Sequence, residues 1–323
     1  MNRRTPAPAE LFFRGRPGDM RLGEWVNSAA PARQTFVILG YPDDQGVRLN
    51  RGRAGAAAGP DGFRKHFYKL TPPADFEWSG RVALQDWGNS HVVTGIQETH
   101  AIAEGNAAEI AAQGALGILI GGGHDFAAPS FKGFRSSAPR ARWGLLNIDP
   151  HLDTREREGS GLHSGNPFRE LLESGALKGQ DLVQFGARAN RNSKTSWEFC
   201  QRQGVSIQTL ETIRSKPSAL AFYRGLLKKL ASRCPNVGVT IDLDSCCEAE
   251  GTSAAPVLGF SAWELCQFAR AAGEIPGVRY LELAEGAPAL DNAERVSRIS
   301  AEIAFAFLDG KAHTKLKIAK KRR

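Results

Sequence analysis

Short apolar runs alternate with longer amphipathic segments along most of the chain. Apolar runs bounded by polar or glycine-containing stretches predict strands at residues 35–40, 82–84, 115–120, 143–149, 182–185, 205–207, 237–243 and 278–283. Apolar residues at helical spacing predict helices at residues 60–70, 96–113, 193–203, 217–231, 261–272 and 293–308, with a short helical stretch after His124. This alternation indicates an α/β fold with a mostly parallel central sheet of about eight strands, covered on both faces.

The middle of the chain has the pattern of one domain. Residues 34–310 contain neither an internal repeat nor an interdomain linker, and a large α/β sheet reaches this size as one unit. Residues 1–33 are rich in Pro, Arg and Ala without a clear period, so we expect an irregular surface segment there. Residues 311–323 are basic, and we expect them to form a disordered tail.

The net charge of +8 first suggests a nucleic-acid partner. Seven positive charges and no acid lie in residues 311–323, which leaves +1 for the rest of the chain. We therefore expect no specific nucleic-acid partner, although this tail could hold polyanions at low salt.

The composition is that of an ordinary soluble protein, with 41% hydrophobic and 24% charged residues. No window approaches the ~18 apolar residues that a membrane span needs. Arg3 and Arg4 are not followed by an apolar run, so a secretory signal is not expected. Five scattered cysteines favour reduced thiols over a disulfide framework. We expect a cytoplasmic protein that makes no membrane contact.

Three predicted strands end in possible metal ligands. The run at 115–120 leads into three glycines and His124, the central run leads into Asp149-Pro-His151-Leu-Asp153, and the run at 237–241 leads into Asp242-Leu-Asp244. Alternate residues of a strand share a face, and ligands of open α/β sheets bind beyond the carboxyl ends of strands. A lone Asp in such a place is usually a loop cap, but six residues in this pattern favour a metal site.

The six candidate ligands are too many for one octahedral ion once water is included. They suit a pair of divalent ions about 3.5–4 Å apart, an arrangement that activates water near neutral pH. Oxygen-rich ligation with two imidazoles favours two Mn²⁺, with Fe²⁺, Co²⁺ or Zn²⁺ as alternatives.

These three motifs resemble those of the ureohydrolase family of arginases, agmatinases and formimidoylglutamases, over roughly residues 35–308. The resemblance implies a three-layer α/β/α fold, a homo-oligomer, and hydrolysis at an amidine or guanidine carbon. It also implies that Asp149 and Asp242 bridge both metals, that His124 and Asp153 complete one site, and that His151 and Asp244 complete the other.

Within the family the chain is most similar to formimidoylglutamases. The similarity lies in residues 46–61, in residues 163–169, and in the absence of Asp-Pro after Asp244. Pro150 stands where the family usually has alanine, and Glu285-Gly-Ala-Pro stands where it usually has Glu-Val-Asn-Pro.

Further residues are candidates for the chemistry on the substrate. Glu285 matches the family glutamate that holds the cationic amidinium, although a surface acid before a helix is the plain alternative. His163 could pass a proton to the leaving amine, because its usual pKa lies near working pH; a loop histidine is otherwise commonly just solvated.

A substrate that carries carboxylates would also need cationic groups in its pocket. Arg155 and Arg188 are candidates, since both lie in loops beyond the predicted strands and an arginine fork can grip a carboxylate. We interpret Arg157 and Arg191 as solvated surface charges.

The sequence thus predicts a hydrolase of linear amidines with a small-molecule substrate, most similar to enzymes that convert N-formimidoyl-L-glutamate and water into L-glutamate and formamide in histidine degradation. Arginine or another guanidino acid is the alternative substrate. A scaffold or nucleic-acid-binding protein without catalysis is a third reading, which six intact ligands disfavour.

Overall fold

The computed structural model describes residues 3–28, 32–157 and 161–314. A single nine-stranded sheet runs through this part of the chain in the order β1-β3-β2-β4-β9-β8-β5-β6-β7. Only β1 is antiparallel to its neighbour. The strands are β1 (Arg4–Thr5), β2 (Gln34–Gly40), β3 (Val82–Ser90), β4 (Leu116–Ile120), β5 (Trp143–Ile148), β6 (Leu182–Ala187), β7 (Ser206–Thr209), β8 (Asn236–Asp242) and β9 (Val278–Ala284).

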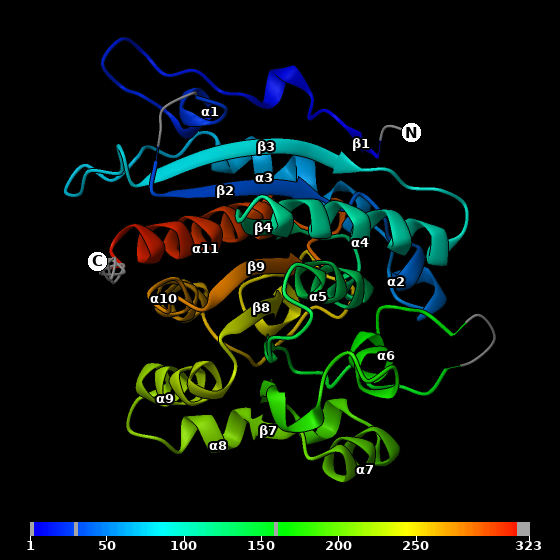
Figure 1. The fold of residues 1–323 in the computed structure, drawn as a ribbon. Coiled ribbons are helices and arrows are strands. Elements are labelled where there is room, and N and C mark those ends of the chain that lie inside the picture. Colours follow the sequence, from blue (N-terminus) through cyan, green and yellow to red (C-terminus); the bar gives the residue numbers. More distant parts are fainter. Residues whose placement is uncertain (1–2, 29–31, 158–160, 315–323) are drawn as a thin grey trace.

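Helices cover both faces of the sheet (Figure 1). One face carries α3 (Gly59–Phe67), α9 (Ala219–Arg233), α10 (Ala262–Gly273) and α11 (Arg295–Ala312), whose apolar residues share one core with the sheet. The other carries α4 (Ile96–Ala112), α5 (Ala127–Ser136), α6 (Pro167–Glu173) and α7 (Lys194–Gln203), which form a second core. Shorter helices are α1 (Leu22–Trp25), α2 (Gln45–Leu49) and α8 (Leu210–Arg214). The predicted α/β fold in three layers is confirmed.

The central strands are buried along most or all of their length. Every residue of β4, β5 and β6 is buried, which is the pattern of parallel strands covered by helices on both faces. In register, Leu119 of β4 and Thr240 of β8 both pair with Glu282 of β9, and Asn147 of β5 pairs with Thr240. Four neighbouring strands therefore bring their carboxyl ends to one edge of the sheet.

The ends of the chain differ from the expectation in detail. The first 33 residues, expected to be irregular, contain β1, which pairs with β3, and α1. The tail boundary expected at residue 311 needs correction, because α11 continues to Ala312. Lys311 is buried there and its Nζ donates a hydrogen bond to the backbone oxygen of Ile275 at 2.7 Å. Residues 315–323 lie outside the described residues. None of the helices that the structure describes is long and apolar enough to cross a membrane.

Candidate metal centre

The loop that carries His124 begins where β4 ends and packs closely on a neighbouring loop. A side chain at Gly122 would place its Cβ 1.6 Å from the backbone oxygen of Asp43, so only glycine allows this approach. The chain then enters a 3₁₀ turn over His124–Phe126, which directs the imidazole toward the ends of β5 and β8.

His124 faces three buried carboxylates. Its Nδ1 lies 3.0 Å from Oδ2 of Asp153, 3.2 Å from Oδ2 of Asp149 and 3.3 Å from Oδ2 of Asp242. On the other side of the ring, Nε2 lies 3.0 Å from the hydroxyl of Thr240. Hydrogen on Nε2 suits this bond and leaves the Nδ1 lone pair facing the carboxylates, as a metal ligand requires.

His151 faces a second group of carboxylates. Its Nδ1 lies 3.0 Å from Oδ2 of Asp244 and 3.4 Å from Oδ1 of Asp149. The two groups therefore share Asp149, which turns one oxygen to each imidazole. Asp242 belongs by position to the first group only, and its Oδ1 accepts a hydrogen bond from the backbone N–H of Asp244 at 2.9 Å. The bridging role expected for Asp242 stays a prediction.

The described residues do not balance the negative charge of all these buried carboxylates. Burial and the neighbouring Asp242 raise the pKa of Asp244 well above its usual value, and burial and Asp149 raise the pKa of Asp153 to about 6. Although burial alone would lower it, the carboxylates of Asp244 and Asp149 raise the pKa of His151 to about 12. A buried Oδ1 of Asp244 also has no hydrogen-bond partner in the described chain. This acidic, oxygen-rich donor set fits two divalent cations.

Glu285 lies beside the metal cluster in a strained backbone conformation. Its φ of 64° and the φ of 45° at Asp153 are in the left-handed region, which non-glycine residues adopt at a cost and often at functional sites. Oε1 of Glu285 accepts the backbone N–H of His124 at 3.1 Å, whereas Oε2 is buried without a partner in the described residues. Burial and the carboxylates of Asp242 and Asp244 raise the pKa of Glu285.

Two cavities open beside the ligands. The first, of about 240 Å³, is lined by His151, Asp153, Asp242, Asp244 and Glu285, and by Asn50, Arg51, Gly52, Arg155, Ser164, Ser253 and Ala254. The second, of about 300 Å³, is lined by His151, Asp153, Arg155, Arg191, Asn192, Ser193 and Ser196. Arg155 lines both cavities, as do the candidate ligands His151 and Asp153.

The other predicted site residues lie around these cavities. Arg191 is exposed, as expected, yet it lines the second cavity. Arg188 is buried, its backbone N–H donates to the oxygen of Pro150, and it is not among the residues that line either cavity. His163 is half-buried beside Ser164, and its Nδ1 accepts the backbone N–H of Gly165 at 3.1 Å.

Sequence reasoning missed part of the cavity wall. Asn50 and Arg51 come from the long loop after β2, where the length of the loop and the family similarity of residues 46–61 were signals but no single residue stood out. Ser253 comes from the segment between β8 and α10, and its hydroxyl accepts the backbone N–H of Arg53 at 2.9 Å. No local pattern marks that serine.

Paired ligand groups at the strand ends of a parallel α/β sheet define a metal-dependent hydrolase with a binuclear centre. The chain belongs to the arginase family, whose model matches residues 34–309. This confirms the family resemblance seen in the motifs.

The relatives and solved structures agree on the branch of the family. The chain is 30% identical to a formimidoylglutamase of Cupriavidus pinatubonensis, over 84% of this chain and 86% of the relative. It is 28% identical to a formimidoylglutamase of Aeromonas hydrophila, over 93% and 94% of the two chains. The structure superposes with a TM-score of 0.83 on a crystal structure of Trypanosoma cruzi formiminoglutamase with Mn²⁺, which is 28% identical and covers 92% of this chain and 100% of that one.

Proposed function

We propose that this protein hydrolyses N-formimidoyl-L-glutamate to L-glutamate and formamide with two Mn²⁺ ions. The observation that carries the proposal is the placement of Asp149 between two imidazole–carboxylate groups, beside a cavity that holds a buried acid, Glu285, and an arginine, Arg155. This order of charges matches a substrate with an amidinium at one end and carboxylates at the other.

The metal ligands divide into two sets. His124, Asp149, Asp153 and Asp242 would hold one ion, and Asp149, His151 and Asp244 would hold the other, with Asp242 as a further bridge. A pair of divalent ions supplies an activated water for attack on the amidine carbon.

Glu285 would orient the electrophilic carbon. Its unpartnered Oε2 can accept a hydrogen bond from the amidinium, a charge-assisted contact that fixes the angle of attack. The same contact supplies the positive charge that this buried carboxylate lacks.

Arg155 and Arg191 would bind the substrate carboxylates. Both line the second cavity, together with Ser193, the N-cap of α7. Arginine forks and a helix N-terminus both favour anions there. The substrate contact expected for Arg188 stays a prediction, because this buried residue lines neither cavity.

His163 would transfer the proton to the leaving amine. Only the imidazolium form, with a proton on each nitrogen, can give a proton to the amine, so the ring would first take up a proton at Nδ1, which in this structure accepts the backbone N–H of Gly165. Adjacent Ser164 lines the first cavity, so the loop that carries both residues borders the reacting groups.

Free arginine, the alternative substrate, fits this cavity less well, because its ammonium lies beside its carboxylate and would be repelled by the Arg155 and Arg191 side chains. Agmatine has no carboxylate for these side chains to bind. The test compares kcat/KM of the Mn²⁺-loaded protein for formiminoglutamate, arginine and agmatine, with metal-stripped protein as control. Formamide release should dominate by orders of magnitude. Faster urea release from arginine would overturn the proposal.

We also propose a cytoplasmic location. All five cysteines are free thiols, which suits a reducing compartment. Fractionation of cells that produce the protein would test this, and recovery outside the cytoplasmic fraction would contradict it.

A further inference from the structure

The backbone of Asp153 departs from the conformations that non-glycine residues prefer. Its φ of 45° is in the left-handed region, which such a residue adopts at a cost and keeps only where the surrounding structure holds it. The next residue, Thr154, is fully buried. Contacts made to residues 153 and 154 therefore determine whether the Asp153 carboxylate stays 3.0 Å from Nδ1 of His124.

Two consecutive residues of α6 hold this stretch of backbone. The backbone N–H of Phe168 donates to the backbone oxygen of Asp153 at 3.2 Å, and Nε of Arg169 donates to the backbone oxygen of Thr154 at 2.9 Å. The ring of Phe168 also packs edge to face against the imidazole of His124, with 5.4 Å between the ring centroids. The two residues of α6 therefore act on two candidate ligands of the first group.

Arg169 is itself held in place by α7. Its guanidinium carbon lies 4.0 Å from the centre of the Phe199 ring, and both residues are buried. A guanidinium can stack on a ring through its face while an N–H at its edge donates a hydrogen bond. The stack on Phe199 therefore directs the Nε–H of Arg169 toward the oxygen of Thr154.

The other polar contact of Arg169 is weaker. Nη1 donates to Oε1 of Glu173 at 3.0 Å, but the Glu173 side chain is 42% exposed, and ion pairs of this kind contribute little to stability. By contrast, loss of the Nε–H would take a donor from the backbone oxygen of a fully buried residue, which is costly. The bond to Thr154 is thus the contact through which Arg169 affects the metal centre.

Asp153 belongs to one of the two ligand groups. It lies in the group around His124 and is not a member of the group around His151. A change of backbone conformation at residue 153 should therefore disturb the first ion site and spare the second.

We propose that Arg169 is a positioning residue of the metal centre. Its bond to Thr154, oriented by the stack on Phe199, keeps Asp153 in the conformation in which its carboxylate serves the first ion. This inference rests on the metal centre of the proposed function but not on its substrate.

Titration of the metal-free full chain with Mn²⁺ tests the proposal. Arg169→Met keeps a long side chain but removes the donor, so it should weaken binding of one ion by ~10–100-fold, the usual effect of losing a residue that orients a metal ligand, and leave the other affinity unchanged. Arg169→Lys can still donate to Thr154 but has no planar group to stack on Phe199, so its loss should be smaller. Phe199→Leu should likewise give a smaller loss of the same affinity.

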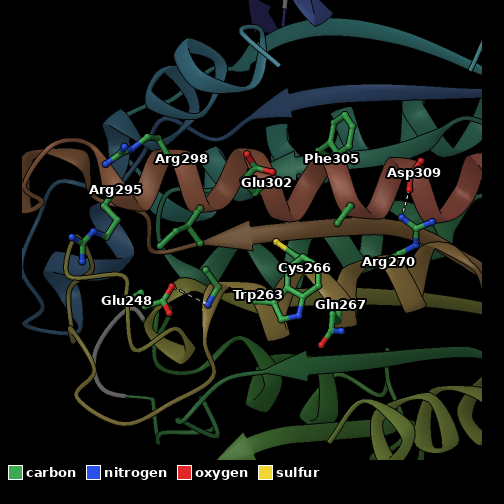
Figure 2. A pocket seen from close by; sticks show the side chains of 13 residues that line it. Glu248, Trp263, Cys266, Gln267, Arg270, Arg295, Arg298, Glu302, Phe305 and Asp309 are labelled. Carbon is green, nitrogen blue, oxygen red and sulfur yellow. Dashed lines mark hydrogen bonds and ion pairs between the residues drawn. The ribbon is translucent and has the colours of Figure 1, made fainter. Parts of the chain in front are cut away.

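Two variants serve as matched controls and should bind both ions as the wild type does. Glu173→Gln changes the exposed partner of Arg169 and leaves the bond to Thr154 in place. Arg270→Met removes an arginine that pairs with Asp309 in the groove between α10 and α11, on the other face of the sheet (Figure 2). The same loss in Arg270→Met would show a general effect of removing a paired arginine and would overturn the assignment.

A double-mutant cycle tests whether Arg169 acts through Asp153. Asp153→Asn should weaken binding of the same ion, and Arg169→Met should add little to that loss, because both changes affect one ligand. Additive losses would overturn the proposal, as would unchanged affinities in Arg169→Met or an equal fall in both.

Circular dichroism of the metal-free variants checks that each one is folded. If Arg169→Met does not fold, the two milder variants decide, and wild-type binding of both ions by Arg169→Lys and by Phe199→Leu would overturn the proposal. Because the titration does not depend on turnover, a chain that binds two ions without hydrolysing formiminoglutamate would contradict the proposed function alone.

Discussion

Oε1 of Glu285 accepts the backbone N–H of His124 at 3.1 Å. This bond joins the end of β9 to the loop that carries the first imidazole, so the residue proposed to hold the substrate also shapes the metal centre. Two functions of one side chain can then be separated by the choice of substitution.

Glu285→Gln keeps an oxygen acceptor for His124 but removes the negative charge. We expect it to retain both metals and to lower kcat/KM by a factor of roughly 10²–10³, the scale of losing one charged contact of about 3–4 kcal/mol. Glu285→Ala should lower metal content as well. Elemental analysis beside kinetics separates the two, and full activity of the Gln variant would remove Glu285 from the substrate site.

Asp149 is the one ligand that the structure places between both groups. Asp149→Ala should therefore abolish binding of both metals, whereas His124→Ala should chiefly weaken one. Asp242→Ala distinguishes the two possible roles of Asp242. Loss of both metals would indicate that Asp242 bridges them, and loss of one would indicate that it is a ligand of the first group only. Two metals retained in Asp149→Ala would contradict the shared position.

His163→Asn should lower kcat at least tenfold while metal content stays unchanged, since general acid–base groups contribute ~10²–10⁴-fold. The asparagine Oδ1 can still accept the backbone N–H of Gly165, so the loop should keep its conformation. Unchanged turnover would show that another group protonates the amine.

Arg155→Ala and Arg191→Ala should each raise KM for formiminoglutamate about tenfold or more, with a smaller fall in kcat, because both residues would bind parts of the substrate that do not react. Arg157→Ala is the control, since Arg157 is exposed and its Nε lies 3.7 Å from Oε2 of Glu173. A rise in KM as large for Arg157→Ala as for the other two would argue against a defined carboxylate site.

Lys311 should make stability depend on pH. Burial, and to a lesser degree Arg279, lowers the pKa of Lys311 to about 7, below its usual value near 10.5. Between these values the unfolded chain binds the proton and the folded chain does not, so folding loses stability as the pH falls through this window. Lys311→Met should therefore stabilise the protein by up to a few kcal/mol at pH 7 and by much less near pH 10. Urea unfolding at both values tests this, with Lys194→Met as control; an equal effect at both would contradict it.

The pattern of apolar residues along the sequence was sufficient to predict the strands of the central sheet. The strands that lead to His124, Asp149 and Asp242 are mostly apolar, as is typical of parallel strands covered on both faces, and their ends locate the ligands. The resemblance to known motifs then supplied the pairing of ligands into two groups.

Other elements depend on contacts distant in sequence. Arg4 and Thr5 form β1 because Ser90 and Asn89 of β3 offer an open edge, not because two polar residues favour a strand. Lys311 continues α11 into the core although a lysine there suggests solvent. The convergence of Arg155 and Arg191 on one cavity likewise follows from loop packing, which no spacing encodes.

The hydrogen bond between His124 and Thr240 joins residues 116 positions apart. In the sheet, β9 lies between β4 and β8, and it is the last of the strands along the chain. No fragment that ends before β9 therefore holds the two halves of the centre together, and contacts of such long range form late and slowly during folding. Ions that bind only the assembled site stabilise the native state by mass action. Bound metal should therefore favour the arrangement in which β9 lies between β4 and β8.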